Sequence, residues 1–191
     1  MCGRFTLKNK KAVKKLYNID IASSYNIAPS QKILMFSGIK LDYIPWSFSP
    51  NWSKLPMNLS NARLESIDIK PSFKNCKKCV IIADGWYEWK RIAKEKIPFY
   101  HYVNNSLIHM AGIYNDKGCA IVTTNACSNT SHIHHRQPLL LEGLSILNWI
   151  EEKQLMTSNL SDKIKFYPVS KYVNYPSNND AECIKKLYNY K

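Results

Sequence analysis

The second residue of the chain, Cys2, offers the most distinctive chemistry in the sequence. If Met1 is removed, Cys2 carries an α-amine and a thiol on adjacent carbons, and this pair can close a five-membered thiazolidine ring on an aldehyde. An α-amino group titrates near roughly pH 8, far below a lysine, so a nucleophilic neutral fraction exists at neutral pH. Cys2 is therefore a candidate nucleophile, and the alternative is a small residue that merely follows the start codon.

Three further segments are polar or aromatic where the local pattern does not require it. If the first is extended, Asn61, Arg63 and Glu65 share one face. In the second, Glu88 lies among aromatic residues just after an apolar run, where a carboxyl tends to have a raised pKa. The third holds His134 ahead of an apolar run. Each motif alone is more often structural than catalytic. The segments are residues 61–65 (NARLE), 84–89 (DGWYEW) and 134–138 (HHRQP).

The elements that must position these residues are mostly short strands. Turn signals separate apolar or alternating runs, and they predict a hairpin early in the chain and a meander in its middle. Helical spacing predicts a short basic helix over residues 9–17, a weak helix over 128–134, and strong helices over 144–155 and 180–188, the last with Asp180 as its cap. The predicted strands are residues 31–36, 40–46, 80–83, 98–103, 107–114, 119–124 and 163–169, and residues 24–29 and 47–57 are predicted loops, the second displaying Trp52.

The fold class predicted from this order is α+β, a single domain with a mainly antiparallel β-sheet or barrel and peripheral helices. The length of 191 residues suits one domain, which we place at residues 2–174, with residues 175–191 as a C-terminal helix packed on or flanking it.

The net charge of +13, from 27 basic and 14 acidic residues, favours a polyanionic partner, and nucleic acid is the first choice. Only four of the basic residues are Arg, which marks each as a candidate multidentate donor. No signal sequence or membrane-length apolar run is present, so we expect an intracellular protein away from membranes. Six cysteines are expected as thiols, and Cys76 and Cys79 form only half of a zinc site, so no metal or other cofactor is predicted.

Taken together, six segments in order resemble the SRAP family, the SOS response-associated peptidases, also called abasic site processing proteins. They cover the chain from residue 2 to about residue 174: CGRF at 2–5, YNIAP at 25–29, NARLE at 61–65, ADGWYEW at 83–89, HHRQP at 134–138 and PVS at 168–170. Three positions depart from the family pattern. Gln137 replaces the usual Met, His135 occupies a position that is often acidic, and Ser53 stands where some members have a second Trp.

The resemblance implies a sensor and shield of abasic sites in single-stranded DNA, acting as a monomer, with possible removal of its own leading residue. It makes Cys2 the crosslinking residue and Asn61 and Arg63 substrate-positioning groups, with Glu88 and His134 as the acid/base pair. His134 is the general acid expected at the sugar ring oxygen. The DNA-binding residues expected are Arg4, Phe5, Pro29, Trp52, Arg63 and Arg136.

Two alternatives stay open at this point. An N-terminal-nucleophile amidohydrolase, similar to glutamine amidotransferase domains, would use the free amine as base and the thiol as nucleophile on an amide. A non-catalytic single-strand binding module would leave Cys2 incidental. Release of ammonia from glutamine would mark the first, and salt-sensitive binding without a covalent product would mark the second.

Overall fold

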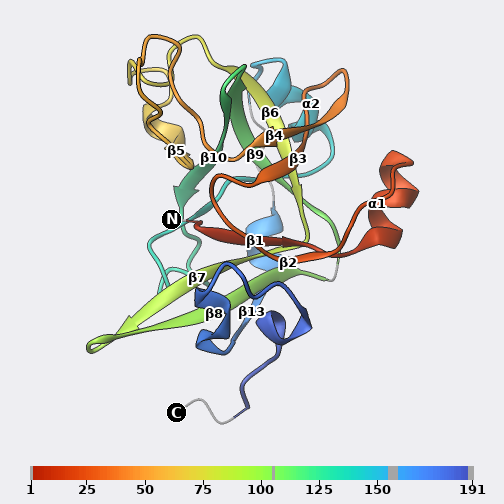
Figure 1. Ribbon diagram of the computed structural model, residues 1–191, viewed down its shortest axis with the longest axis vertical. Helices are drawn as coiled ribbons and strands as arrows, with labels where there is room; N and C mark the ends of the chain where they lie inside the picture. The colour runs from red at the N-terminus through yellow and green to blue at the C-terminus, as the bar shows by residue number, and fades with distance from the viewer. Residues whose placement is uncertain (1, 105, 155–158, 189–191) are drawn as a thin grey trace.

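The computed structural model describes residues 2–104, 106–154 and 159–188, and these form two packed β-sheets with two short α-helices (Figure 1). The helices are α1 (Lys10–Tyr17) and α2 (Leu144–Ile150). The strands are β1 (Arg4–Leu7), β2 (Ser24–Ile27), β3 (Lys32–Phe36), β4 (Leu41–Pro45), β5 (Asn61–Arg63), β6 (Lys77–Ala83), β7 (Gly85–Ile92), β8 (Glu95–Val103), β9 (Ile108–Asn115), β10 (Gly118–Asn125), β11 (Arg136–Pro138), β12 (Leu140–Leu141) and β13 (Ile164–Pro168). Short 3-10 turns lie at Leu64–Ser66, Asn159–Lys163, Lys171–Asn174 and Ala181–Ile184.

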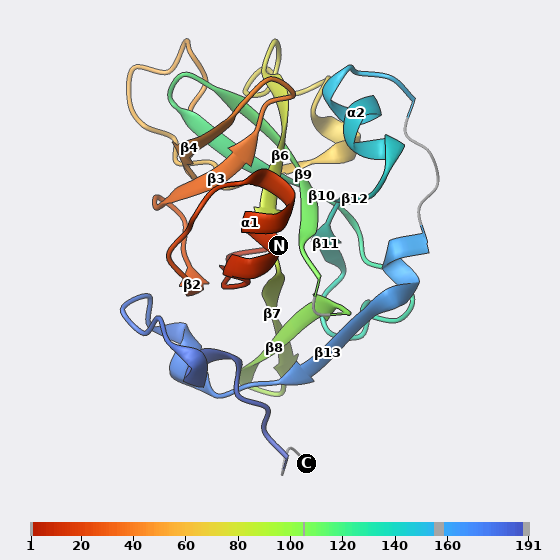
Figure 2. The ribbon, with the colours of Figure 1, turned by 90° about the vertical axis from the view of Figure 1, so that its right-hand side faces the viewer.

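The first sheet has the order β13-β8-β7-β1-β2, and the second has β11-β10-β9-β6-β3-β4, with β12 on β9 and β5 on β10. Every pairing is antiparallel except that of β5 with β10. Figure 2 shows the second sheet above the first, with β13 and β8 below. The mainly antiparallel α+β prediction is confirmed, and the sheets remain open instead of closing into a barrel.

The apolar core lies between the two sheets, where β1 and β7 contribute Phe5 and Trp86 and the second sheet contributes Ile81 and Met110. All four side chains are fully buried. Successive residues of a strand point to opposite faces, so Tyr87 lies on the other side of β7 and forms a second cluster with Tyr100, Val173 and Cys183. The C-terminal segment therefore covers the outer face of the first sheet, and the domain boundary at residue 174 stays a prediction.

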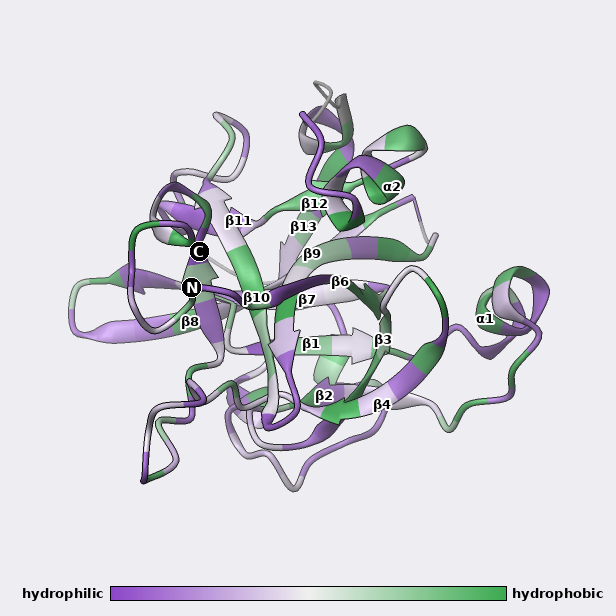
Figure 3. Cartoon of the chain, turned by 90° about the horizontal axis from the view of Figure 1, so that it is seen from above, coloured by the Kyte–Doolittle hydropathy of each residue, from purple (hydrophilic) through white to green (hydrophobic). Residues whose placement is uncertain are grey.

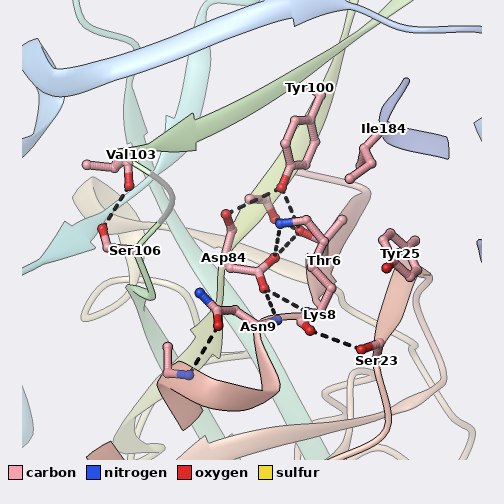
Figure 4. Close-up of polar contacts among 12 residues, drawn as sticks. Thr6, Lys8, Asn9, Ser23, Tyr25, Asp84, Tyr100, Val103, Ser106 and Ile184 are labelled. Carbon is pink, nitrogen blue, oxygen red and sulfur yellow. Dashed lines mark hydrogen bonds and ion pairs between the residues drawn. The ribbon is translucent and has the colours of Figure 1, made fainter. Parts of the chain in front are cut away.

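The corner between the two sheets is a single residue, Asp84, which joins β6 directly to β7. Its buried carboxylate accepts hydrogen bonds from the Thr6 hydroxyl (2.5 Å) and from the backbone N–H groups of Lys8 (2.6 Å) and Asn9 (2.7 Å), as Figure 4 shows. Gly85 follows because a Cβ there would lie 2.2 Å from the Tyr100 hydroxyl oxygen. The corner therefore fixes the end of β1 against the start of β7.

Most predicted strands and the first helix are confirmed with small changes at their ends. The Asn9 side chain caps α1 by accepting from the Ala12 N–H at 3.1 Å, and Asn18 ends the helix in the left-handed region. The predicted hairpin is β3 and β4. The predicted meander forms only in part, because β9 pairs with β10 whereas β8 belongs to the other sheet and pairs with β7 and β13. Among the helices of the described residues, none has the length and apolar content that crossing a membrane requires.

Four local predictions are wrong. Residues 24–27 are strand β2 because β1 supplies pairing partners. Residues 128–133 form turns instead of a helix, and α2 ends at Ile150. The C-terminal helix is reduced to one 3-10 turn, although Asp180 caps it by accepting from the Glu182 N–H at 2.9 Å. That turn ends where Lys186 forms a bridge with Val169, so a pairing partner again overrides local propensity.

Asp84→Ala tests the corner. The change removes the acceptor of three buried or half-buried donors, so we expect the free energy of unfolding to fall by about 3 kcal/mol. Urea denaturation followed by tryptophan fluorescence measures it, with Asp116→Ala in the exposed β9–β10 turn as the matched control. A loss below about 1 kcal/mol for Asp84→Ala would show that the corner is not held by this carboxylate.

Candidate functional site

Cys2 lies just before β1, with its side chain fully buried. Its Sγ atom is 3.7 Å from the carbonyl oxygen of Arg4. The Asn61 side-chain amide donates a 2.9 Å hydrogen bond to the Cys2 carbonyl oxygen. Asn61 is fixed in turn by β5, whose parallel pairing places it beside Ile121 of β10. A short strand from the second sheet therefore holds the backbone of the candidate nucleophile.

Glu88 lies in the middle of β7, opposite Phe99 of β8, and not at a strand end as the sequence suggested. Only 3% of the residue is exposed. Burial raises the pKa of its carboxyl from the ordinary 4.5 to about 7. The carboxyl is thus about half protonated at neutral pH and can both give and accept a proton.

His134 presents its ring to Glu88 from the segment before β11. Its Nδ1 lies 3.8 Å from Glu88 Oε2 and accepts a 3.0 Å hydrogen bond from the backbone N–H of Arg136. The same Nδ1 lies 3.1 Å from the Arg136 carbonyl oxygen, so it accepts from the N–H in one tautomer and donates to the carbonyl oxygen in the other. The ring also stacks on His135, with 4.5 Å between ring centres. Burial is the largest cause that lowers the pKa of His134. A mainly neutral imidazole therefore faces the carboxyl at neutral pH.

Cys2 and Glu88 are electrostatically coupled. Burial first, and then the charge of Glu88, raise the pKa of the Cys2 thiol well above its usual value. The thiol is therefore protonated at neutral pH and needs a base at the moment that it reacts. The structure brings Cys2, Asn61, Glu88 and His134 together, from segments that are far apart in the sequence.

Two of the predicted phosphate-binding arginines bind acceptors of the protein itself, Arg4 at a half-buried position and Arg136 at a buried one. Arg4 donates to the Asn26 side-chain oxygen and to the carbonyl oxygens of Val173 and Asn174, at 2.9–3.2 Å. Arg136 is 4% exposed and forms two 2.9 Å hydrogen bonds with the Glu65 carboxylate. Both guanidinium groups are part of the framework in this structure.

Arg63, by contrast, is exposed at the end of β5. Strand β5 stops at this residue and a 3-10 turn follows, so Glu65 does not continue the extended face that the sequence predicted. Its carboxylate pairs with Arg136 instead, and Arg63 is left as the exposed guanidinium of the segment.

The predicted stacking residues differ in exposure. Phe5 is fully buried and meets Trp46 edge to face with ring centres 5.2 Å apart, so it offers no exposed ring to a base. Pro29 is exposed just after β2. Trp52 is 63% exposed on the predicted loop, which the Lys117 ammonium anchors through the carbonyl oxygens of Pro50, Asn51 and Ser53, at 3.2–3.3 Å.

A cleft of about 750 Å³ opens beside Glu88 and His134. Its wall includes Trp89, Arg91, Lys96 and Asn174, which were not among the predicted site residues. Strand alternation gave no signal for them, because it places Trp89 and Arg91 on the face of β7 opposite Glu88, and Arg91 pairs with Lys96 across the hairpin. The Trp89 indole is fixed by a 2.8 Å hydrogen bond to the side-chain oxygen of Asn174. The cleft therefore joins the acid/base pair to an aromatic and basic wall.

The departures from the family pattern have separate environments. Gln137 is buried, and its side-chain oxygen accepts from the Cys127 N–H and the Thr130 hydroxyl at 2.9–3.1 Å. His135 contacts His134 directly and contributes to the lowering of its pKa. Within the described residues, no group of three or more His, Cys, Asp or Glu is arranged to hold a metal ion.

Comparison with known sequences gives one consistent picture. A family model described as SOS response associated peptidase (SRAP) matches residues 1–176. The "Abasic site processing protein YoqW" of Bacillus subtilis is 34% identical over 97% of this chain and 99% of its own length. The Escherichia coli protein YedK, with the same description, is 30% identical over 90% of this chain and 88% of its length. Rat HMCES, also so described, is 31% identical, and the match covers 73% of this chain and 54% of that protein.

Solved structures share the fold. A crystal structure of a protein from Bacteroides thetaiotaomicron superimposes with a TM-score of 0.79 over 97% of this chain and all of that one, at 22% identity. At this identity the likeness concerns the fold alone.

The raised pKa of Glu88 makes a testable link between the site and stability. Below pH 4.5 the Glu88 carboxyl is protonated in the folded protein and in the unfolded chain. Between pH 4.5 and about 7 the unfolded chain releases this proton, whereas the folded protein keeps it. The free energy of unfolding should fall over this range by about 3 kcal/mol more in the wild type than in Glu88→Gln. Urea denaturation between pH 4.5 and 7.5 measures the difference, and the exposed Glu95→Gln is the control. Parallel curves for wild type and Glu88→Gln would contradict the buried carboxyl.

Proposed function

This chain belongs to the SOS response associated peptidase (SRAP) family, and from that premise we propose that it recognises abasic sites in single-stranded DNA and bonds to them through Cys2. Relatives that carry the description abasic site processing protein align over most of the chain, which supports DNA damage as its setting. The observation that carries the proposal is the group of buried Cys2, buried Glu88 and half-buried His134 at the head of β1.

The proposed bond formation starts at the α-amine that removal of Met1 uncovers. Because the Cys2 thiol is protonated, the amine attacks the C1′ aldehyde of the open sugar first, and the carbinolamine loses water to give an imine. The Cys2 sulfur then adds to the imine carbon and its proton passes to the nitrogen. The product is a thiazolidine, the net by-product is one water, and the strand is protected from β-elimination.

The pKa directions refine the roles of the acid/base pair. His134 is mainly neutral, so it is poorly suited to the role of general acid that the family resemblance implies. Glu88, with a pKa of about 7, is the better proton donor to the sugar ring oxygen and afterwards the acceptor for the amine proton. We therefore assign proton transfer to Glu88 and assign to His134 the orientation of that carboxyl.

Strand recognition in this proposal relies on the exposed groups. Trp52 supplies a stacking face, while Arg63, Arg91 and Lys96 supply donors for phosphates. Stacking and backbone contacts need no particular base, which suits a protein that must find a lesion in any sequence. Pro29 lies exposed beyond β2 as a further contact.

The covalent step is tested on a single-stranded oligonucleotide that carries one abasic site. Wild type should give a crosslink that survives heating, and Cys2→Ala and Cys2→Ser should lose at least about nine-tenths of it, because an imine without the thiol hydrolyses. Denaturing gels measure the yield, and Cys127→Ser, which changes a different, half-buried thiol, should match wild type. Equal heat-stable yields from wild type and Cys2→Ala would overturn the proposal.

Removal of Met1 is the second proposed activity, with Cys2 as the attacking group and Glu88 as its base. In a cell-free translation system without methionine aminopeptidase, wild type should lose one methionine mass and Glu88→Ala should keep it. Intact-protein mass spectrometry reads the result, and addition of the aminopeptidase should process both. Retention of Met1 by wild type would show that the residue is removed by another enzyme.

A further inference from the structure

The helix α1 carries an unusual concentration of positive charge. Four of its eight residues are lysines, and all four are exposed. They are Lys10, Lys11, Lys14 and Lys15. The helix projects from the body of the protein at the end of β1 opposite the N-terminus, as Figures 1 and 3 show.

This charge arrangement is unfavourable for the helix itself. Lys10 and Lys11 lie in the first turn, which has no acidic residue, and positive charge there opposes the helix dipole. Lys10 with Lys14 and Lys11 with Lys15 are like-charge pairs at i,i+4, which destabilise a helix. Lys14 pairs with Asp20 at 2.6 Å, whereas no described acidic side chain lies within ion-pair distance of Lys10, Lys11 or Lys15. Helix stability therefore does not explain these lysines.

The opposite face of α1 is already used by the protein. Val13 is fully buried, and the Tyr17 hydroxyl lies 2.7 Å from Nε2 of His109 on β9. Leu16 is the large apolar side chain that stays exposed. With its apolar face packed inward, α1 lacks the broad apolar surface that a helix needs to lie in a membrane. The exposed face fits a polyanion that is recognised by charge.

We propose that the exposed lysine face of α1 is a second nucleic-acid contact, which binds the phosphate backbone of DNA at a distance from the reacting sugar. The choice of DNA as the polyanion rests on the proposed function. Cys2 and Lys10 are separated by the length of β1 and its flanks, at most about 26 Å of extended chain. Lys10 and Lys11 hold phosphates that lie beyond the cleft, so this surface contributes to affinity and not to bond formation.

Lys10→Glu/Lys11→Glu tests the surface, because acidic residues in the first turn suit the helix dipole and should leave the fold intact. Its control is Lys165→Glu/Lys186→Glu, with the same change of charge at two exposed sites on other segments. Fluorescence anisotropy with an undamaged 30-nucleotide strand, at several salt concentrations, measures affinity. The rate of crosslinking to a trinucleotide with a central abasic site, which spans about 10 Å, measures chemistry without reach to α1.

For Lys10→Glu/Lys11→Glu we expect about tenfold weaker binding of the 30-mer, and a slope of log affinity against log salt that is smaller by about 1 to 2. The trinucleotide rate should equal that of wild type. If the control variant loses as much affinity for the 30-mer, the effect is due to overall charge. If Lys10→Glu/Lys11→Glu binds the 30-mer as tightly as wild type, α1 is not a DNA contact. Both outcomes overturn the inference. Binding of undamaged DNA needs no reaction at Cys2, so it tests the α1 surface separately from the proposed function. If wild type forms no crosslink but Lys10→Glu/Lys11→Glu still weakens binding of the 30-mer, the result counts against the proposed function and not against the α1 surface.

Discussion

The carboxylate of Asp84 is the constraint on which the rest of the structure depends. It occupies the one residue between β6 and β7, where the chain leaves one sheet and enters the other, and it holds the end of β1 through Thr6, Lys8 and Asn9. Because β1 pairs with β7 in antiparallel register, fixing the end of β1 also fixes its beginning, and Arg4 lies opposite Tyr87. The head of β1 is thereby placed beside the middle of β7, and a residue just before β1 cannot shift without breaking the corner.

The reactivity of the site follows from this placement and from burial. A carboxyl in the middle of a strand between two sheets loses water, which raises the pKa of Glu88. The same burial, with the Glu88 charge, keeps the Cys2 thiol protonated. Burial is the largest cause of both shifts. In the mechanism that we propose, the order of steps, amine before sulfur, follows from the burial of Cys2.

The sequence correctly predicted those elements in which local propensity and the contacts with neighbouring strands favour the same structure. The α1 helix with its Asn9 cap and the β3–β4 hairpin are such cases. Two of the failures share a cause, since β2 and the segment after Asp180 have weak or contrary propensities and adopt structures set by pairing with β1 and with Val169. For the site, ordered motifs predicted which residues meet. They did not predict that Glu88 lies within a strand, because the extent of β7 is set by pairing with β8.

Arginine and lysine have different roles in this protein. Arg4 and Arg136 each meet several fixed oxygen acceptors, a role that suits a planar fork of donors and that a lysine cannot fill. Lysine dominates the remaining positive charge, and its flexible ammonium groups lie mostly at the surface. Two of the four arginines, Arg4 and Arg136, thus make multidentate contacts, and their acceptors are the protein's own carbonyl, amide and carboxylate oxygens. The excess charge available to a partner resides largely in the lysines, and α1 holds four of them in eight residues.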